Sequence, residues 1–330
     1  MYSFSSSIRN LSEYNQMVYF NKNLVIETYI IGYKNEGESI LFFIRVDGGI
    51  SFSGLVDCFQ VDGVNKVKDI LAENSICKLD FICWTHPDLD HSKGMKEILN
   101  EYVSAKTQIW IPEGVDVRDI KCSKEVKDLF SYLKECVVKE DAEFNVYSAS
   151  DQKDLLYYNS ICFQRGMDRY PLKLFSYTPN SKIIRKQTYM DKFKKNDRSI
   201  FFVLGLGDVR IFLTGDIEDD TIERIPRGIF GEHIHIMKIP HHGSDSSVKM
   251  LELGWNECDI ACSTVYRKGT NLPVESIMKQ YSENAKHLLC TGKVDREKEK
   301  EQYGMVKIMT DVIKNEYSIN IEGNADIWSA

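Results

Sequence analysis

The chain has 330 residues, of which 43% are hydrophobic, and a formal net charge of -7. This is enough apolar material for one large globular domain or two modest ones. The acidic balance argues against a protein that coats nucleic acid over its whole surface, although a local basic groove remains compatible with it.

Membrane and secretory signals are missing from the sequence. No apolar run reaches the length of a membrane span, and the serine-rich residues 1–10 lack the basic region and apolar core of a signal peptide. The nine scattered cysteines are an odd number in a large chain, which favours reduced thiols. We therefore expect a cytoplasmic protein with no membrane association.

The first third of the chain predicts strands alternating with two helices. In chain order, the expected strands are 24–31, 39–46, 54–58 and 79–84, and the expected helices are 64–72 and 92–102. The second helix carries Met95, Ile98 and Leu99 at the i, i+3, i+4 spacing of one apolar helix face. This pattern predicts a mixed α/β domain.

The remaining two thirds predict many short strands and few helices. The expected strands are 108–111, 144–147, 172–177, 199–204, 209–213, 234–239, 260–265, 288–290, 305–309 and 317–321, and the expected helices are 126–138 and 274–281. A basic stretch at 182–198 precedes one of the strands. It is either a solvated loop or helix face, or a substrate-binding segment.

The turn after strand 79–84 concentrates potential metal ligands. His86, Asp88, Asp90 and His91 fall within six residues, and Pro87 keeps a helix from starting too early. Carboxylate oxygen and imidazole nitrogen together suit zinc, manganese or iron. The alternative is a polar surface turn in which Asp90 or Ser92 caps the following helix.

Two later strand ends add residues of the same kind. Asp216 follows Gly215 directly after the hairpin at 199–213, and His241 and His242 follow the strand at 234–239. Because acidic and histidine residues collect at several strand ends, we favour a metal site over a polar surface turn as the interpretation of residues 86–91. His233 and His235 alternate along a strand, and we expect them to be structural.

Four ordered motifs resemble the metallo-β-lactamase superfamily, and within it the metallo-β-lactamase-like domain of ComEC-type competence proteins. The motifs are Thr85-His86-Pro87-Asp88-Leu89-Asp90-His91, Asn196-Asp197-Arg198-Ser199, Leu213-Thr214-Gly215-Asp216 and Ile239-Pro240-His241-His242-Gly243-Ser244. The resemblance implies a four-layered αββα sandwich (α/β, α+β class), formed by one domain over 1–330 with a charged insertion near 113–198.

The resemblance also implies a site for two divalent metal ions, zinc or manganese. One ion would be held by Asp90, His91 and a histidine of the 241–242 pair. We assign His241 to the metal and His242 to proton transfer, and the reverse assignment stays open. The other ion would be held by His86 and Asp88, and Asp216 would bridge the two ions.

Two departures from the family pattern concern this second ion. The superfamily usually has a histidine where this chain has Asp88, although the ComEC-like branch shares the aspartate. Asn196 lies in the region where a further histidine is expected. Both departures leave the ion at His86 and Asp88 with fewer nitrogen ligands.

The function that the resemblance implies is a metal-dependent phosphodiesterase or nuclease acting on DNA or RNA. Catalysis is assigned to Asp90, His242 and Asn196, and substrate binding to Lys192, Lys194, Lys195 and Ser244. One alternative is hydrolysis of a small molecule such as a cyclic nucleotide, a phosphocholine ester or a lactone. Another is a binding or regulatory module with weakened catalysis, acting with an unidentified protein partner.

Overall fold

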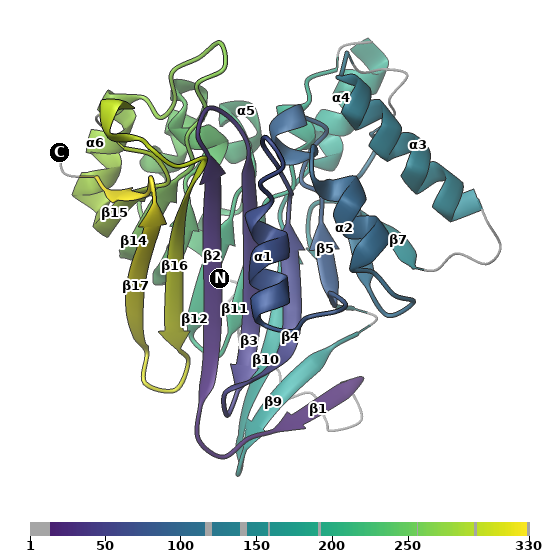
Figure 1. Cartoon of the computed structure of the whole chain (residues 1–330), viewed down its shortest axis with the longest axis vertical. Coiled ribbons are helices and arrows are strands. Elements are labelled where there is room, and N and C mark those ends of the chain that lie inside the picture. The colour runs from purple at the N-terminus through teal and green to yellow at the C-terminus, as the bar shows by residue number, and fades with distance from the viewer. Residues whose placement is uncertain are drawn as a thin grey trace.

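Two β-sheets pack face to face, and helices cover both outer faces (Figure 1). The computed structural model describes residues 14–115, 121–138, 144–157, 159–190, 193–255, 257–293 and 296–328. No helix within these residues is long and apolar enough to span a membrane. Lys192, predicted to bind substrate, lies outside the described residues.

The first sheet has eight strands among the described residues. In spatial order they are β17 (Glu316–Gly323), β16 (Tyr303–Asp311), β2 (Leu24–Tyr33), β3 (Glu38–Val46), β4 (Gly49–Val56), β5 (Phe81–Cys83), β6 (Gln108–Pro112) and β7 (Asn145–Ala149). Its outer face is covered by α1 (Lys66–Glu73), α2 (Met95–Glu101) and α3 (Lys124–Val138), whose buried apolar residues join one cluster with the sheet.

The second sheet has ten strands among the described residues. They are β1 (Gln16–Tyr19), β9 (Ile161–Arg165), β10 (Asp168–Ser176), β11 (Phe202–Leu206), β12 (Val209–Leu213), β13 (Ile234–Lys238), β14 (Cys258–Ser263), β15 (Ala285–Cys290) and β18 (Asp326–Ile327), with β8 (Lys153–Asp154) beside β10. The short α5 (Asp219–Ile222) and α6 (Glu275–Asn284) pack on its outer face through another apolar cluster.

Between the sheets lies the main apolar core. Side chains such as Phe42 and Phe81 from the first sheet meet Phe202 and Ile236 from the second, and all four are almost fully buried. Alternate residues of each strand point to opposite faces, so both sheets bury an inner and an outer layer. The predicted four-layered αββα sandwich is confirmed.

The strand directions bring the predicted motifs to one edge of this sandwich. Strands β4 to β7 run parallel to one another, and so do β12 to β15. Carboxyl ends of parallel strands share one edge of a sheet, where ligands of α/β proteins commonly bind. The motif residues follow the ends of β5, β12 and β13.

Residues 113–198 supply secondary structure to both sheets. They contribute β7 to the first sheet and β8, β9 and β10 to the second. The basic stretch begins with a helix, α4 (Ser181–Met190), rather than a loop. Asn180 starts this helix, because its Oδ1 accepts the backbone N–H groups of Lys182 at 3.1 Å and Ile183 at 3.4 Å.

Candidate metal centre

Three buried histidines converge on one carboxylate oxygen of Asp216. His86 follows β5, His91 ends the short helix η2 (Leu89–His91), and His242 lies in the turn η6 (Pro240–Gly243). Their Nε2 atoms lie 3.8, 3.4 and 3.4 Å, respectively, from Asp216 Oδ2. Asp90 Oδ2 completes the group at 3.4 Å from His91 Nε2 and 3.2 Å from His242 Nε2.

Four separations between neighbouring atoms of this group resemble those between the ligands of a divalent cation. Asp90 Oδ2, His91 Nε2, Asp216 Oδ2 and His242 Nε2 form a closed ring with neighbours 3.2–3.4 Å apart. A tetrahedral zinc with bonds of about 2.0–2.1 Å would separate its ligand atoms by about 3.3–3.4 Å. The Nε2 atoms of His86 and His91 are buried without a hydrogen-bond partner among the described residues, as ligand atoms awaiting a cation would be.

Residues behind the histidines fix which ring nitrogen faces the centre. His91 Nδ1 lies 2.7 Å from Asp57 Oδ2, so this nitrogen carries the proton and donates it to the carboxylate. His86 Nδ1 lies 3.1 Å from the hydroxyl of Thr85, which itself donates to Asp57 at 2.6 Å. Such outer partners orient imidazole ligands and leave Nε2 free for the metal.

His242 is oriented by a second buried network. Its Nδ1 lies 2.9 Å from Thr264 Oγ1, and Thr264 in turn donates to Glu38. Lys238 Nζ lies 2.8 Å from Glu38 Oε2 and 3.5 Å from Asp216 Oδ1. Glu38 lies close enough to His91, Asp216 and His242 to be a candidate metal ligand. However, its carboxylate oxygens face the Nδ1 atoms of His91 and His242 and already pair with Lys238 and Thr264. We place Glu38 behind the ligands.

The electrostatics of the group match a cation site. Burial lowers the pKa of His86 well below its usual value, so its imidazole is neutral and can donate a lone pair. Burial also opposes the charging of His242, but Asp216 and Asp90 outweigh it and raise the pKa of His242 to about 9. Burial would raise the pKa of Asp216, yet His242, His91 and Lys238 hold it well below its usual range. A bound cation would replace the histidine protons that now balance these carboxylates.

A second group of donors lies beside the first. His86 Nε2 is 3.6 Å from Asp88 Oδ2 and 3.8 Å from Asp216 Oδ2. The other oxygen of Asp88 contacts Lys195 Nζ. A cation here would have one nitrogen and two carboxylate oxygens as ligands, and it would share Asp216 with the first position.

The two histidines of the 241–242 pair point in different directions. His241 and His242 both adopt left-handed backbone angles, with φ of 46° and 54°, which is costly for residues other than glycine and is typical of functional sites. The turn sends His242 inward, whereas His241 Nδ1 lies 2.8 Å from Ser246 Oγ and its Nε2 lies 3.4 Å from Asn196 Nδ2. The structure thus places His242 among the buried donor atoms and His241 outside them, whereas we expected His241 to be the one beside the metal.

The loop that carries Asp216 is held by the Asn196-Asp197-Arg198-Ser199 motif. Gly215 has φ +52°, and a Cβ there would lie 2.3 Å from Ser199 Oγ. This close approach lets the Asp216 backbone N–H donate to Ser199 Oγ at 2.9 Å. Arg198 donates to the carbonyls of Glu113 and Gly114, so it anchors the chain rather than facing the metal centre.

Of the remaining predicted residues, Lys194, Lys195 and Asn196 line a cavity beside Asp88. A cavity of about 340 Å³ is lined by Asp88, Lys194, Lys195, Asn196 and Glu218. Asn196 donates to Glu218 Oε1 at 3.0 Å. Ser244, expected to bind substrate, caps the following 3-10 helix η7 (Asp245–Leu253) by accepting the Ser246 backbone N–H.

Sequence reasoning missed the residues that support the centre. They are Glu38, Asp57, Lys238, Thr264 and Tyr266, whose ring stacks on His242 at 5.3 Å between centroids. The sequence does contain one sign of this network. Lys238 lies inside the apolar strand at 234–239, and a buried lysine requires a buried acidic partner. Nothing in the local sequence names Glu38 as that partner.

A second histidine cluster lies apart from the centre. His233 Nε2 is 2.7 Å from Asp259 Oδ2. His235 accepts the Arg210 backbone N–H at Nδ1, and its Nε2 faces Asn315 Oδ1 at 2.6 Å. Both ring nitrogens of His235 are thus engaged, which leaves it no lone pair for a metal.

Comparisons with known proteins find a likeness only at the level of three-dimensional structure. No protein-family model and no curated protein sequence matches the chain. The chain is similar to a Parabacteroides distasonis protein provisionally described as a metal-dependent hydrolase (TM-score 0.40, 14% identity, 78% of this chain and 92% of that one). It is also similar to zinc-bound PqqB from Methylobacterium extorquens (TM-score 0.41, 10% identity, 78% and 97%). Such scores describe partly overlapping folds and carry no information about the activity of this chain.

Proposed function

We propose that the protein is a metal-dependent phosphodiesterase that uses a water activated by two divalent cations. The observation that carries this proposal is the convergence of three histidine Nε2 atoms on Asp216 Oδ2. Asp90, His91, Asp216 and His242 would hold the first cation, and His86, Asp88 and Asp216 the second. When bound, a cation pair supplies a hydroxide at neutral pH and neutralises charge on a phosphoryl group.

The side chains at the cavity suit a phosphate-bearing substrate. Lys194 and Lys195 bring two positive charges to the wall next to Asp88, where they can pair with phosphate oxygens. Asn196 and His241 lie together beyond the ligands, and each can offer a hydrogen bond to the substrate. These groups would bind and orient the substrate, while Asp90 and His242 would contribute to catalysis by holding the first cation.

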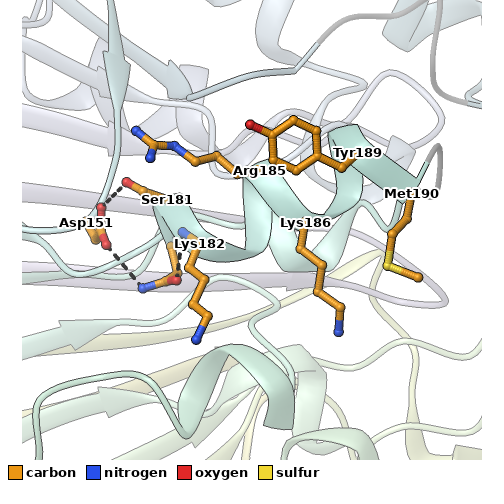
Figure 2. A pocket seen from close by; sticks show the side chains of 8 residues that line it. Asp151, Ser181, Lys182, Arg185, Lys186, Tyr189 and Met190 are labelled. Atoms are coloured by element: carbon orange, nitrogen blue, oxygen red, sulfur yellow. Dashed lines mark hydrogen bonds between the residues drawn. The ribbon is translucent and has the colours of Figure 1, made fainter.

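A basic groove along α4 supports a nucleic-acid substrate. A cavity of about 640 Å³ is lined by Lys182, Arg185 and Lys186 together with Tyr189, whose side chain is 85% exposed (Figure 2). The one carboxylate in its lining, Asp151, accepts hydrogen bonds from Ser181 at 2.6 Å and Asn180 at 3.1 Å. Exposed cations beside an exposed aromatic ring form the kind of surface that tracks a phosphate backbone and stacks bases.

A small phosphodiester, such as a cyclic nucleotide, is the second candidate. The cavity next to Asp88 is about 340 Å³, within the range that holds a small ligand, and Glu218 in its wall would repel a closely packed polyanion. The two candidates predict different effects of the α4 cations.

An activity panel with added manganese tests the proposed function. We would measure hydrolysis of single-stranded DNA, RNA, a cyclic dinucleotide and bis(p-nitrophenyl) phosphate, with and without prior removal of metal by a chelator. The proposal expects turnover of at least one phosphodiester that depends on added metal. Chelator-resistant turnover, or no turnover of any of the four, would contradict it.

The α4 groove yields a prediction about substrate class. Replacing Lys182, Arg185 and Lys186 together by glutamine should weaken nucleic-acid binding and flatten its salt dependence, because fewer counterions are released. Turnover of bis(p-nitrophenyl) phosphate should stay unchanged. Salt-dependent binding measured by fluorescence anisotropy checks the first expectation.

A matched variant controls for net charge. Lys279 on α6, Lys300 just before β16 and Lys314 just after β16 are exposed. Both α6 and β16 lie on the opposite side of the view from α4 (Figure 1). Replacing these three by glutamine should leave the salt dependence of binding nearly as in the wild type. Equal losses in both triple variants would mean that α4 is not a specific path for the substrate.

A further inference from the structure

Asp88 connects the metal centre to a lysine that competes with a metal ion for the same carboxylate. Its Oδ2 faces His86 Nε2 at 3.6 Å, and its Oδ1 contacts the ammonium of Lys195. Lys195 comes from the segment just before η4 (Asn196–Arg198), more than a hundred residues away in sequence. The contact therefore exists only because the fold brings two distant loops together.

The two cation positions are unequal in the ligands that they offer. The first has two imidazole nitrogens and two carboxylate oxygens, and three of the four residues that carry them are fully or nearly fully buried. The second has His86 Nε2, one oxygen of Asp88 and a share of Asp216 Oδ2, which the first cation also uses. Fewer ligands and a shared oxygen predict weaker binding at the second position.

The ammonium of Lys195 weakens the second position further. A positive charge that touches Asp88 neutralises one of the two carboxylates that would attract the cation, and it repels the cation itself. The Lys195 side chain is 28% exposed, so it can also turn outward to a different anion. The cavity in whose wall it lies is where the phosphate of a substrate would enter.

We propose that the second cation position is a low-affinity site whose occupancy is controlled by Lys195. Without substrate, Lys195 pairs with Asp88 and the protein holds one tightly bound divalent ion. A phosphate group that enters the cavity draws Lys195 away from Asp88, and the second ion then binds at His86, Asp88 and Asp216. This inference rests on the proposed function, because it uses the same centre.

Titration of the metal-free protein with Mn²⁺ alone tests the proposal without any activity measurement. Isothermal titration calorimetry, with free Mn²⁺ followed by electron paramagnetic resonance, gives the number of ions and both dissociation constants. The wild type should bind one ion tightly and a second one more weakly. Lys195→Gln should tighten the second ion by about tenfold or more, with the first unchanged, since a repelling charge is removed and Asp88 is released.

The neighbouring lysine provides a matched control. Lys194 lines the same cavity but makes no ion pair within the part of the chain that the structure describes. Lys194→Gln removes one charge from the same wall and should leave both dissociation constants within about twofold of the wild type. Asp88→Asn should abolish the second ion and keep the first.

The outcomes separate this inference from the proposed function. Two equally tight ions in the wild type, or a second ion that Lys195→Gln does not tighten, would overturn the role of Lys195 and leave the metal centre intact. Equal tightening by Lys194→Gln and Lys195→Gln would also overturn it, since the effect would then be one of general charge. A wild type that binds no ion would overturn the proposed function, and the role of Lys195 with it.

Discussion

Asp216→Asn should lose bound metal and at least about a hundredfold in turnover, the scale expected when a well-placed electrostatic group is removed. Asp216 Oδ2 is the atom on which His86, His91 and His242 converge. An amide of the same shape removes a formal charge and replaces one ligand oxygen by a nitrogen that carries protons. No other carboxylate takes its place, because Gly215 and Ser199 fix the backbone at this point.

The fold of this variant should persist. Asp216 lies in a loop after β12 rather than in the apolar core, so the circular dichroism spectrum should stay close to that of the wild type. The metal-free variant should unfold at a lower temperature, because His91, His242 and Lys238 lose a buried carboxylate partner. Asp220→Asn, on the exposed start of α5, makes the same chemical change a few residues away and should keep both metal and activity. Native turnover in Asp216→Asn would place the chemistry elsewhere.

Lys238→Met should lower the free energy of unfolding of the metal-free protein by about 3–5 kcal/mol, as expected when one partner of a buried ion pair is removed. Lys238 is fully buried on β13, with its ammonium 2.8 Å from Glu38 and 3.5 Å from Asp216. Without it, two buried carboxylates lose their shared cation. Denaturant unfolding in the presence of a chelator measures the loss.

Two comparisons make this second prediction specific. The double variant Glu38→Gln with Lys238→Met removes both charges and should regain part of the lost stability. Added Mn²⁺ should stabilise Lys238→Met more than the wild type, because a bound cation would compensate the Asp216 charge. A single variant as stable as the wild type, or one that manganese does not stabilise, would show that Lys238 does not balance the centre.

The fold was largely predictable because its elements carry local signals. Apolar runs such as Leu79 to Trp84 and the spacing of Met95, Ile98 and Leu99 correspond to β5 and α2 in the structure. The helix α4 was harder to predict, because its charged composition resembles that of a solvated loop. Two hydrogen bonds stabilise the helix. Asn180 caps its first turn, and Gln187 donates to the Asp197 carboxylate at 2.5 Å.

The centre was predictable in part for a different reason. Candidate ligands that follow strand ends can be recognised in the sequence, and the structure brings His86, Asp90, His91 and Asp216 together as predicted. The choice between His241 and His242 could not be read, because it depends on two successive left-handed backbone conformations that no local pattern requires. Glu38 and Asp57 were missed because their roles arise from long-range packing behind the histidines.

The metal content of the wild type and Asp90→Ala shows whether the histidine and aspartate cluster binds a divalent cation. Asp90 Oδ2 lies within 3.4 Å of both His91 Nε2 and His242 Nε2, and we therefore assign it to the proposed first cation position. Both proteins would be loaded with Mn²⁺, desalted and measured by elemental analysis. We expect at least one retained ion per wild-type chain, close to two when manganese is in excess, and loss of the retained ion in Asp90→Ala. Equal, near-zero metal in both proteins would contradict it.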